Sequence, residues 1–168
     1  MQMLLEAGAD ARETSHFGWT ALHASVGSHS SPSWFKGPQG THRLRSAVDC
    51  TSALLAAGAD ANAMAHGDTT PLMVVGCAGN DLSSPWSTRL YAVLLRGGAT
   101  LDDHVLEVIK IEYNTESPYL DKVHDAGGWK RYAQAHQKQL VSLFAPKLRL
   151  PADVIPLVVD FWANVGMY

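Results

Sequence analysis

The sequence predicts an all-α fold in which short pairs of helices repeat along the chain. Three observations favour this fold: one segment occurs three times, apolar residues follow helical spacing, and a glycine ends each apolar run. A segment that recurs along a chain indicates a repeat architecture, in which each unit buries its apolar face against its neighbours. The expected architecture is therefore a helical solenoid.

The recurring segment is an apolar pair followed closely by glycine. Its copies are LLEAGADA at residues 4–11, LLAAGADA at residues 54–61 and LLRGGAT at residues 94–100. A second motif, GWTALH at residues 18–23 and DTTPLM at residues 68–73, follows the first two copies at the same distance. Two motifs that recur in register indicate a true repeat.

This order of motifs resembles that of the ankyrin-repeat family. A repeat of that family opens an inner helix with Thr-Pro-Leu-His, closes an outer helix with Leu-Leu-x-x-Gly-Ala-Asp, and continues into a β-hairpin finger. Each copy of the second motif matches the opening segment at three of its four positions, with Ala21 in place of proline and Met73 in place of histidine. The copies at residues 4–11 and 54–61 match the closing segment. The resemblance implies an ankyrin-repeat α-solenoid of helix-turn-helix units with β-hairpin fingers.

The spacing of the copies departs from the family's period of about 33 residues. Successive copies begin 50 and then 40 residues apart, and both excesses fall between an inner and an outer helix. We expect repeats over residues 1–111, with a partial first repeat and insertions near residues 28–44 and 80–86. The partial repeat indicates either a chain cut from a longer array or a gene model that starts late.

The predicted helix ends carry residues that suit them. A glycine after the apolar pair fits the left-handed position that terminates a helix, which applies to Gly8, Gly58 and Gly98. Helix starts are expected where a hydroxyl can accept a hydrogen bond from the first turn, at Thr20, Thr41, Thr70 and Ser84. The cap at Thr41 would leave residues 28–40 as a loop.

Residues 112–168 are predicted to form a C-terminal helical capping region. Residues 114–118 are interpreted as a loop, and Gly127-Gly128 as an interruption before an amphipathic helix that begins near Trp129 and reaches Phe144. These helices would close the apolar end of the repeat array.

A last helix is expected from about Val154 to Asn164, with Asp153 as its N-cap. It is apolar on nearly every side, so it either packs between other elements or offers a surface to a partner. The segment from Leu150 also bears some likeness to the opening of F-box motifs and to the SOCS box of ubiquitin-ligase adaptors. This likeness implies an alternative function as a ubiquitin-ligase substrate adaptor.

Composition and charge exclude several classes of partner. The 168 residues are 46% apolar and 17% charged, and the formal net charge of -3 lacks the basic excess of nucleic-acid-binding domains. No apolar run approaches the roughly 18 residues of a membrane span, and the N-terminus lacks the features of a signal peptide. We therefore expect no nucleic-acid or membrane partner and an intracellular, cytoplasmic location.

The pattern of reactive residues does not favour an enzyme. Eight histidines are present, but His23 occupies a structural position of the family, and His16 and His66 fall on successive fingers without the third ligand that zinc requires. Paired carboxylates, a nucleophile elbow and a glycine-rich phosphate loop are absent in their required contexts. The prediction is no catalytic residue, no metal and no cofactor, with a regulatory fragment of a larger enzyme as an alternative.

The resemblance implies that the protein is a non-enzymatic scaffold for a partner protein. In this family partners contact the hairpin tips and the concave face of the inner helices. Two aromatic residues of the first insertion either join this surface or fold back over the helix pair. The predicted contact residues are Thr14, Ser15, His16, Phe17, Trp19, Trp34, Phe35, Met64, Ala65, His66 and Thr69.

Overall fold

The structure is a computed structural model that describes residues 2–27, 38–77, 85–111, 117–146, 151 and 153–158. Within these ranges the chain is all-α, as predicted. The helices are α1 (Gln2–Glu6), α2 (Ala21–Gly27), α3 (Pro38–Ala56), α4 (Pro71–Cys77), α5 (Pro85–Arg96), α6 (Asp103–Ile111), α7 (Pro118–Asp125) and α8 (Trp129–Phe144). None of the described helices combines the length and the apolar character required to cross a lipid bilayer.

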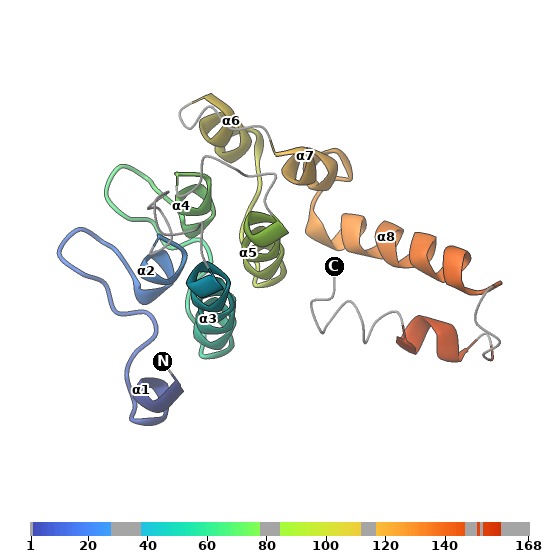
Figure 1. The fold of residues 1–168 in the computed structure, drawn as a ribbon. Coiled ribbons are helices and arrows are strands. Elements are labelled where there is room, and N and C mark those ends of the chain that lie inside the picture. Colours follow the sequence, from blue (N-terminus) through green and yellow to red (C-terminus); the bar gives the residue numbers. More distant parts are fainter. Residues whose placement is uncertain are drawn as a thin grey trace. The chain divides into compact units, whose positions relative to one another are not determined.

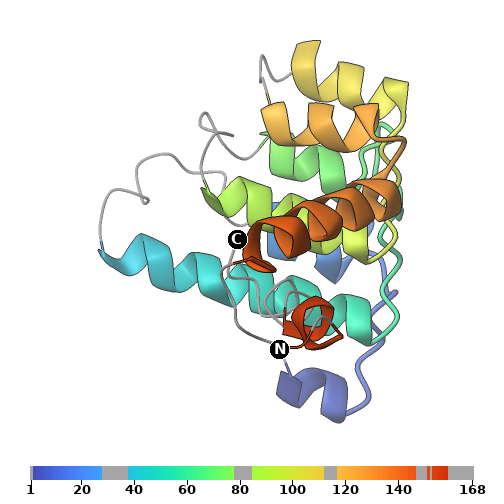
Figure 2. The same ribbon diagram turned by 90° about the vertical axis from the view of Figure 1, so that its right-hand side faces the viewer.

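The chain divides into two compact units, Met1–Asp121 and Lys122–Tyr168. In the first unit α2, α4 and α6 form one row, and α3 and α5 form a second row against it (Figures 1 and 2). The predicted boundary lay between residues 111 and 112, before α7, whereas the two units divide within α7. The first half of α7 belongs to the first unit.

The three recurring segments end their helices in the same way. The N–H groups of Gly8, Gly58 and Gly98 donate to the carbonyl three residues earlier at 3.0, 3.1 and 3.2 Å, and each following alanine N–H donates to the carbonyl five residues earlier. The φ angles of these glycines are 88°, 87° and 100°. This pair of hydrogen bonds requires a left-handed residue, which explains why the sequence places glycine there.

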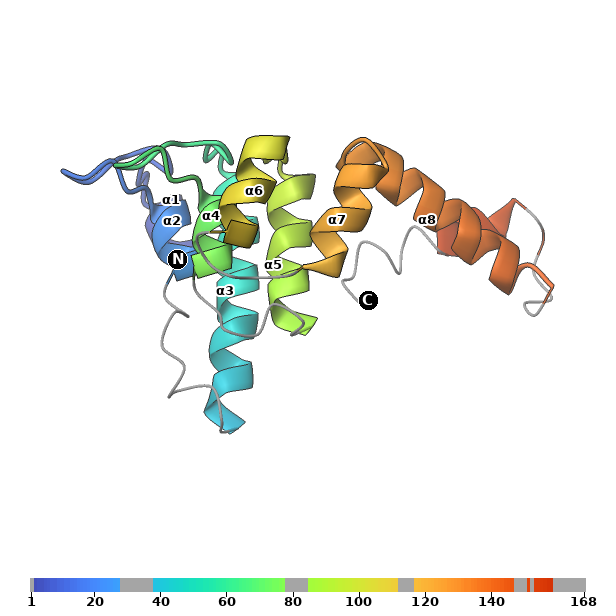
Figure 3. The ribbon, with the colours of Figure 1, turned by 90° about the horizontal axis from the view of Figure 1, so that it is seen from above.

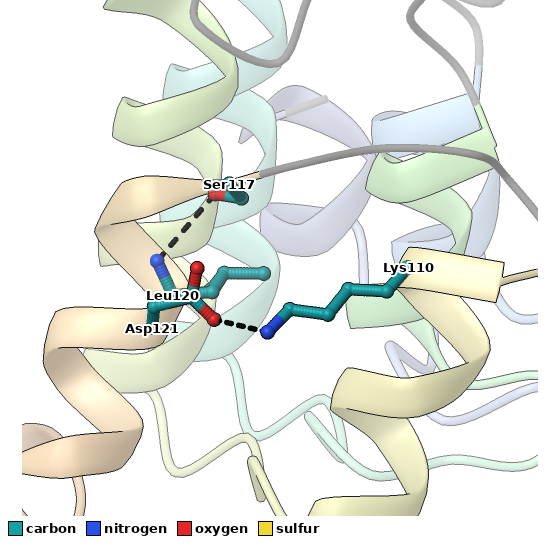
Figure 4. Close-up of polar contacts among 4 residues, drawn as sticks. All are labelled: Lys110, Ser117, Leu120 and Asp121. Carbon is teal, nitrogen blue, oxygen red and sulfur yellow. Dashed lines mark hydrogen bonds and ion pairs between the residues drawn. The ribbon is translucent and has the colours of Figure 1, made fainter.

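Helix α7 was not predicted. Pro118 starts the helix, the hydroxyl of Ser117 accepts a hydrogen bond from the N–H of Leu120 at 3.4 Å, and Lys110 of α6 forms an ion pair with Asp121 (Figure 4). The helix ends like the three predicted copies, because Gly127 and Gly128 donate to the carbonyls of residues 124 and 123. The segment is therefore a fourth copy of this helix ending.

The predicted N-cap at Thr41 was wrong, because α3 begins at Pro38 and runs through Thr41. Proline is favourable in the first turn of a helix, where no intrahelical bond is lost. Most of the predicted first loop, residues 28–37, and residues 78–84 of the second insertion lie outside the described residues.

The core of the first unit is built by side chains from α2 to α6. The largest fully buried apolar side chains of these helices are Leu22, Leu54, Leu72, Tyr91, Leu94 and Ile109. The equivalent leucine of the first copy, Leu4 on α1, is 62% exposed. Equal positions of the repeat therefore differ in burial according to the helices around them.

The second unit contains the predicted amphipathic helix, which is α8. On this helix Tyr132 stacks on His136, with ring centroids 5.8 Å apart and an interplanar angle of 5°. The backbone is also helical from Val154 to Val158, with Ile155 buried and Leu157 exposed. Residues 159–168, which hold the remainder of the predicted last helix and the end of the adaptor-like segment, lie outside the described residues.

Candidate functional site

Two equivalent turns project from the first unit, and we name them finger 1 (residues 14–20) and finger 2 (residues 64–70). In finger 1 the N–H of Ser15 donates to the carbonyl of Trp19 at 2.8 Å, and in finger 2 the N–H of Ala65 donates to that of Thr69 at 3.0 Å. Each finger forms one isolated antiparallel bridge, between Thr14 and Thr20 and between Ala65 and Thr69. The two fingers lie side by side, and each leads directly into a helix, finger 1 into α2 and finger 2 into α4 (Figure 3).

The two fingers contact each other directly through their backbones. The N–H of His66 donates to the carbonyl of Phe17 at 3.0 Å. Gly18 has a φ of 73°, and a Cβ atom there would lie 3.3 Å from the Cα of Ala65 and from the carbonyl oxygen of Met64. Glycine therefore permits this approach, which holds the tips of both fingers in one relative position.

The bases of the fingers are held by side chains at equivalent positions of the repeat. Arg12 Nε donates to the carbonyl of Gly58 at 2.8 Å, and Asn62 Nδ2 donates to the carbonyl of Gly98 at 2.9 Å. The amide oxygen of Asn62 also accepts a hydrogen bond from the N–H of Thr100 at 2.7 Å. The bases of finger 1 and finger 2 are thus tied to the glycines that follow α3 and α5, respectively.

Buried His23 joins α2 to finger 2. Its Nδ1 accepts a hydrogen bond from the N–H of Thr20 at 3.2 Å, so the ring proton is on Nε2, which donates to the carbonyl of Thr69 at 3.1 Å. The hydroxyl of Thr20 lies 2.9 Å from the same Nδ1. Both ring nitrogens are therefore used in structural contacts, which matches the structural role predicted for this histidine.

Burial lowers the pKa of His23 below its ordinary value of 6.5, and hydrogen bonds to backbone groups oppose this shift only in part. The unfolded chain therefore takes up the proton at a higher pH than the folded chain does. The stabilisation from neutral His23 is complete above pH 6.5 and is lost as the pH falls from 6.5 toward the folded pKa.

We therefore expect the wild type to lose more stability between about pH 7.5 and about pH 5.5 than a His23→Gln variant. Glutamine can replace the hydrogen bonds in part but does not titrate. Urea unfolding followed by circular dichroism at the two pH values measures the difference, and the other histidines cancel in the comparison. An equal loss in both proteins would contradict the assignment.

Three large side chains of the fingers remain open to solvent, and we name them with the neighbouring histidines the finger face: His16, Phe17, Trp19, Met64 and His66. Phe17 is 67% exposed, Met64 is 68% exposed and Trp19 is 40% exposed. The indole ring of Trp19 lies against α2, because a Cβ atom on Gly27 would be 3.4 Å from it. Trp19 is thus held in place on one side and exposed on the other.

The remaining predicted contact residues fall into three groups. Thr14, Ser15, His16 and His66 are exposed, and Thr69 is half-buried. Ala65 is only 6% exposed, because it lies under Gly18 of the neighbouring finger. Its predicted place on the contact surface was wrong for this reason. Trp34 and Phe35 lie outside the described residues.

The side chains of the finger face decide which contacts it can offer. Among the described residues no group of three or more histidine, cysteine, aspartate or glutamate side chains is placed to hold a metal ion. The finger face instead presents aromatic and thioether groups on a backbone fixed by hydrogen bonds. The anchors Arg12 and Asn62 were missed in the sequence, although both follow the first leucine of a recurring segment by eight residues.

Comparison with known proteins finds no matching family model, no curated relative and no solved structure.

Proposed function

We propose that this protein is an ankyrin-repeat binding module that holds a partner protein on the finger face. The observation that carries the proposal is that Phe17 and Met64 are each about two-thirds exposed to solvent, on two fingers joined by a backbone hydrogen bond. Grouped exposed apolar side chains on a folded surface are typical of interaction sites.

The fold supports this role by keeping the finger face in one shape. The hydrogen bond from His66 to Phe17 joins the tips of the two fingers. The hydrogen bonds of Arg12 to Gly58 and of His23 to Thr69 join the first repeat to the second repeat. A surface whose parts are already fixed loses little conformational entropy when a partner binds. Aromatic residues on such a surface commonly provide most of the binding energy.

Recurring helix endings support the ankyrin-repeat assignment. Their hydrogen bonds and left-handed glycines recur at Gly8, Gly58 and Gly98, and the two fingers recur at the spacing that the sequence motifs share. The row of α2, α4 and α6 then corresponds to the inner helices, and the fingers lead into its first two members.

Combined replacement of Phe17 and Met64 by alanine should weaken partner binding by about 2 kcal/mol, or about thirtyfold. The reason is that large side chains which become buried against a partner provide most of the binding energy. Stability should change by no more than about 0.5 kcal/mol, because neither side chain is buried. Affinity capture from the protein's own cell lysate identifies the partner, and titration with the purified partner gives the dissociation constants.

The matched control is Leu143→Ala, which removes a side chain of α8 that is 53% exposed. This variant should bind the partner as the wild type does. An unchanged dissociation constant for the Phe17 and Met64 variant, with its circular dichroism spectrum unchanged, would contradict the proposal that the finger face binds the partner.

A further inference from the structure

Three exposed carboxylates lie next to finger 1, within finger 2 and at the start of α6. Glu13 directly precedes finger 1, Asp68 lies within finger 2, and both are exposed. Asp102 lies at the start of α6, where its Oδ1 accepts a hydrogen bond from the N–H of Val105 at 2.8 Å. The start of α6 is held at the base of finger 2, because the N–H of Thr100 donates to the amide oxygen of Asn62.

Basic groups balance these carboxylates only in part on the described part of the same surface. Arg12 is the one lysine or arginine between residues 10 and 20; it keeps its positive charge, while its guanidinium donates to the neutral carbonyl of Gly58. Residues 60–70 contain no lysine or arginine, and neither do α2 and α4. On α6, Lys110 is paired with Asp121 of α7 (Figure 4).

From this combination we infer that the occupant of the finger face is a cationic peptide segment of the partner, with a large apolar side chain beside its lysine or arginine residues. The apolar side chain contacts Phe17, Trp19 and Met64, while the cationic groups lie over Glu13, Asp68 and Asp102. The inference rests on the proposed function and adds the chemistry of the partner. Opposite charges across an interface speed association and select against anionic partners.

The charge arrangement is distinct from the ordinary stabilisation of helix starts. Asp102 caps α6 and has a local structural reason to be acidic. Asp68 has no such role, because it adopts a φ of 55° within finger 2 and precedes α4 by more than one residue. Glu13 likewise lies outside any helix. Two of the three carboxylates therefore lie at the fingers without a helix to stabilise.

A pair of fluorescein-labelled peptides of about twelve residues tests the inference, one of lysine, leucine and a single tryptophan, the other with glutamate in place of lysine. Fluorescence anisotropy with the full chain gives both affinities. We expect the lysine peptide to bind at least about tenfold more tightly than the glutamate peptide, and to lose affinity between about 50 and about 300 mM salt.

A triple variant carrying Glu13→Gln, Asp68→Asn and Asp102→Asn should bind the lysine peptide about tenfold more weakly, since exposed charge pairs each contribute modestly. Asparagine keeps the cap of α6 and tolerates a positive φ, so the fold is retained. The control variant carries Glu6→Gln, Asp49→Asn and Asp125→Asn, which removes the same charge from exposed positions on α1, α3 and α7. It should bind like the wild type.

Several results would overturn the cationic occupant: equal affinity for both peptides, equal weakening by both triple variants, or unchanged binding of the lysine peptide by the Phe17 and Met64 variant. Self-association in sedimentation equilibrium that the first triple variant abolishes would replace the peptide with a second copy of this chain. If the Phe17 and Met64 variant loses the captured partner while the lysine peptide fails to bind, the proposed function stands and only the cationic occupant fails.

Discussion

Replacing Leu54 with alanine should lower the free energy of unfolding by about 3 kcal/mol, whereas the same replacement of Leu4 should cost about 0.5 kcal/mol or less. The two residues hold the same position in the recurring segment, but Leu54 is 1% exposed and Leu4 is 62% exposed. Truncation of a buried leucine loses its transfer free energy and leaves a cavity, while truncation of an exposed leucine does neither.

The third copy provides a second test in the same protein. Leu94 is fully buried at the end of α5, so Leu94→Ala should resemble Leu54→Ala, with a cost of about 3 kcal/mol. Urea unfolding followed by circular dichroism gives all three values under one condition. Similar losses at Leu4 and Leu54 would contradict the difference in burial, and a small loss at Leu94 would contradict the packing of α5.

His23→Ala should lower the free energy of unfolding by about 3 kcal/mol, because the change removes a fully buried ring and leaves buried backbone groups without partners. The carbonyl of Thr69 loses its donor, and the N–H of Thr20 loses its acceptor. The link between α2 and finger 2 is lost with them. Thermal and urea unfolding of the purified variant measure the loss.

The control is Met73→Leu on α4, at the position of the second repeat that corresponds to His23. Met73 is 5% exposed and fills space without a side-chain hydrogen bond to replace, so the change should cost less than about 1.5 kcal/mol. His23→Gln should fall between the wild type and His23→Ala, since it can keep one of the hydrogen bonds. A His23→Ala variant as stable as Met73→Leu would show that neither the volume of the ring nor its hydrogen bonds stabilise the fold.

The finger face was predicted in part because the fingers follow from local sequence. Phe17, Trp19, Met64 and the two histidines lie between a helix-ending glycine and a helix-starting threonine, so their place in an exposed turn could be inferred. Ala65 could not be placed in this way, because its burial depends on contact with Gly18, which is distant in the chain. The roles of Arg12 and Asn62 were not predicted for the same reason, since their hydrogen-bond acceptors, Gly58 and Gly98, are distant in the chain.

By itself the sequence determined the features that depend on neighbouring residues. The helix ends at Gly8, Gly58 and Gly98 follow from the need for a left-handed residue, and the amphipathic period predicts α8 from Trp129 to Phe144. The all-α class follows from these features together with the recurrence of the segment.

Only the tertiary structure decided the features that depend on distant residues. It shows α7 as a fourth copy of the helix ending, although its sequence lacks the leucine pair, and it buries Leu54 and Leu94 while leaving Leu4 exposed. It also joins the two fingers through the bond between His66 and Phe17. The physical reason is that hydrogen bonds within a turn depend on local backbone conformation, whereas burial and contacts between turns depend on which elements pack together.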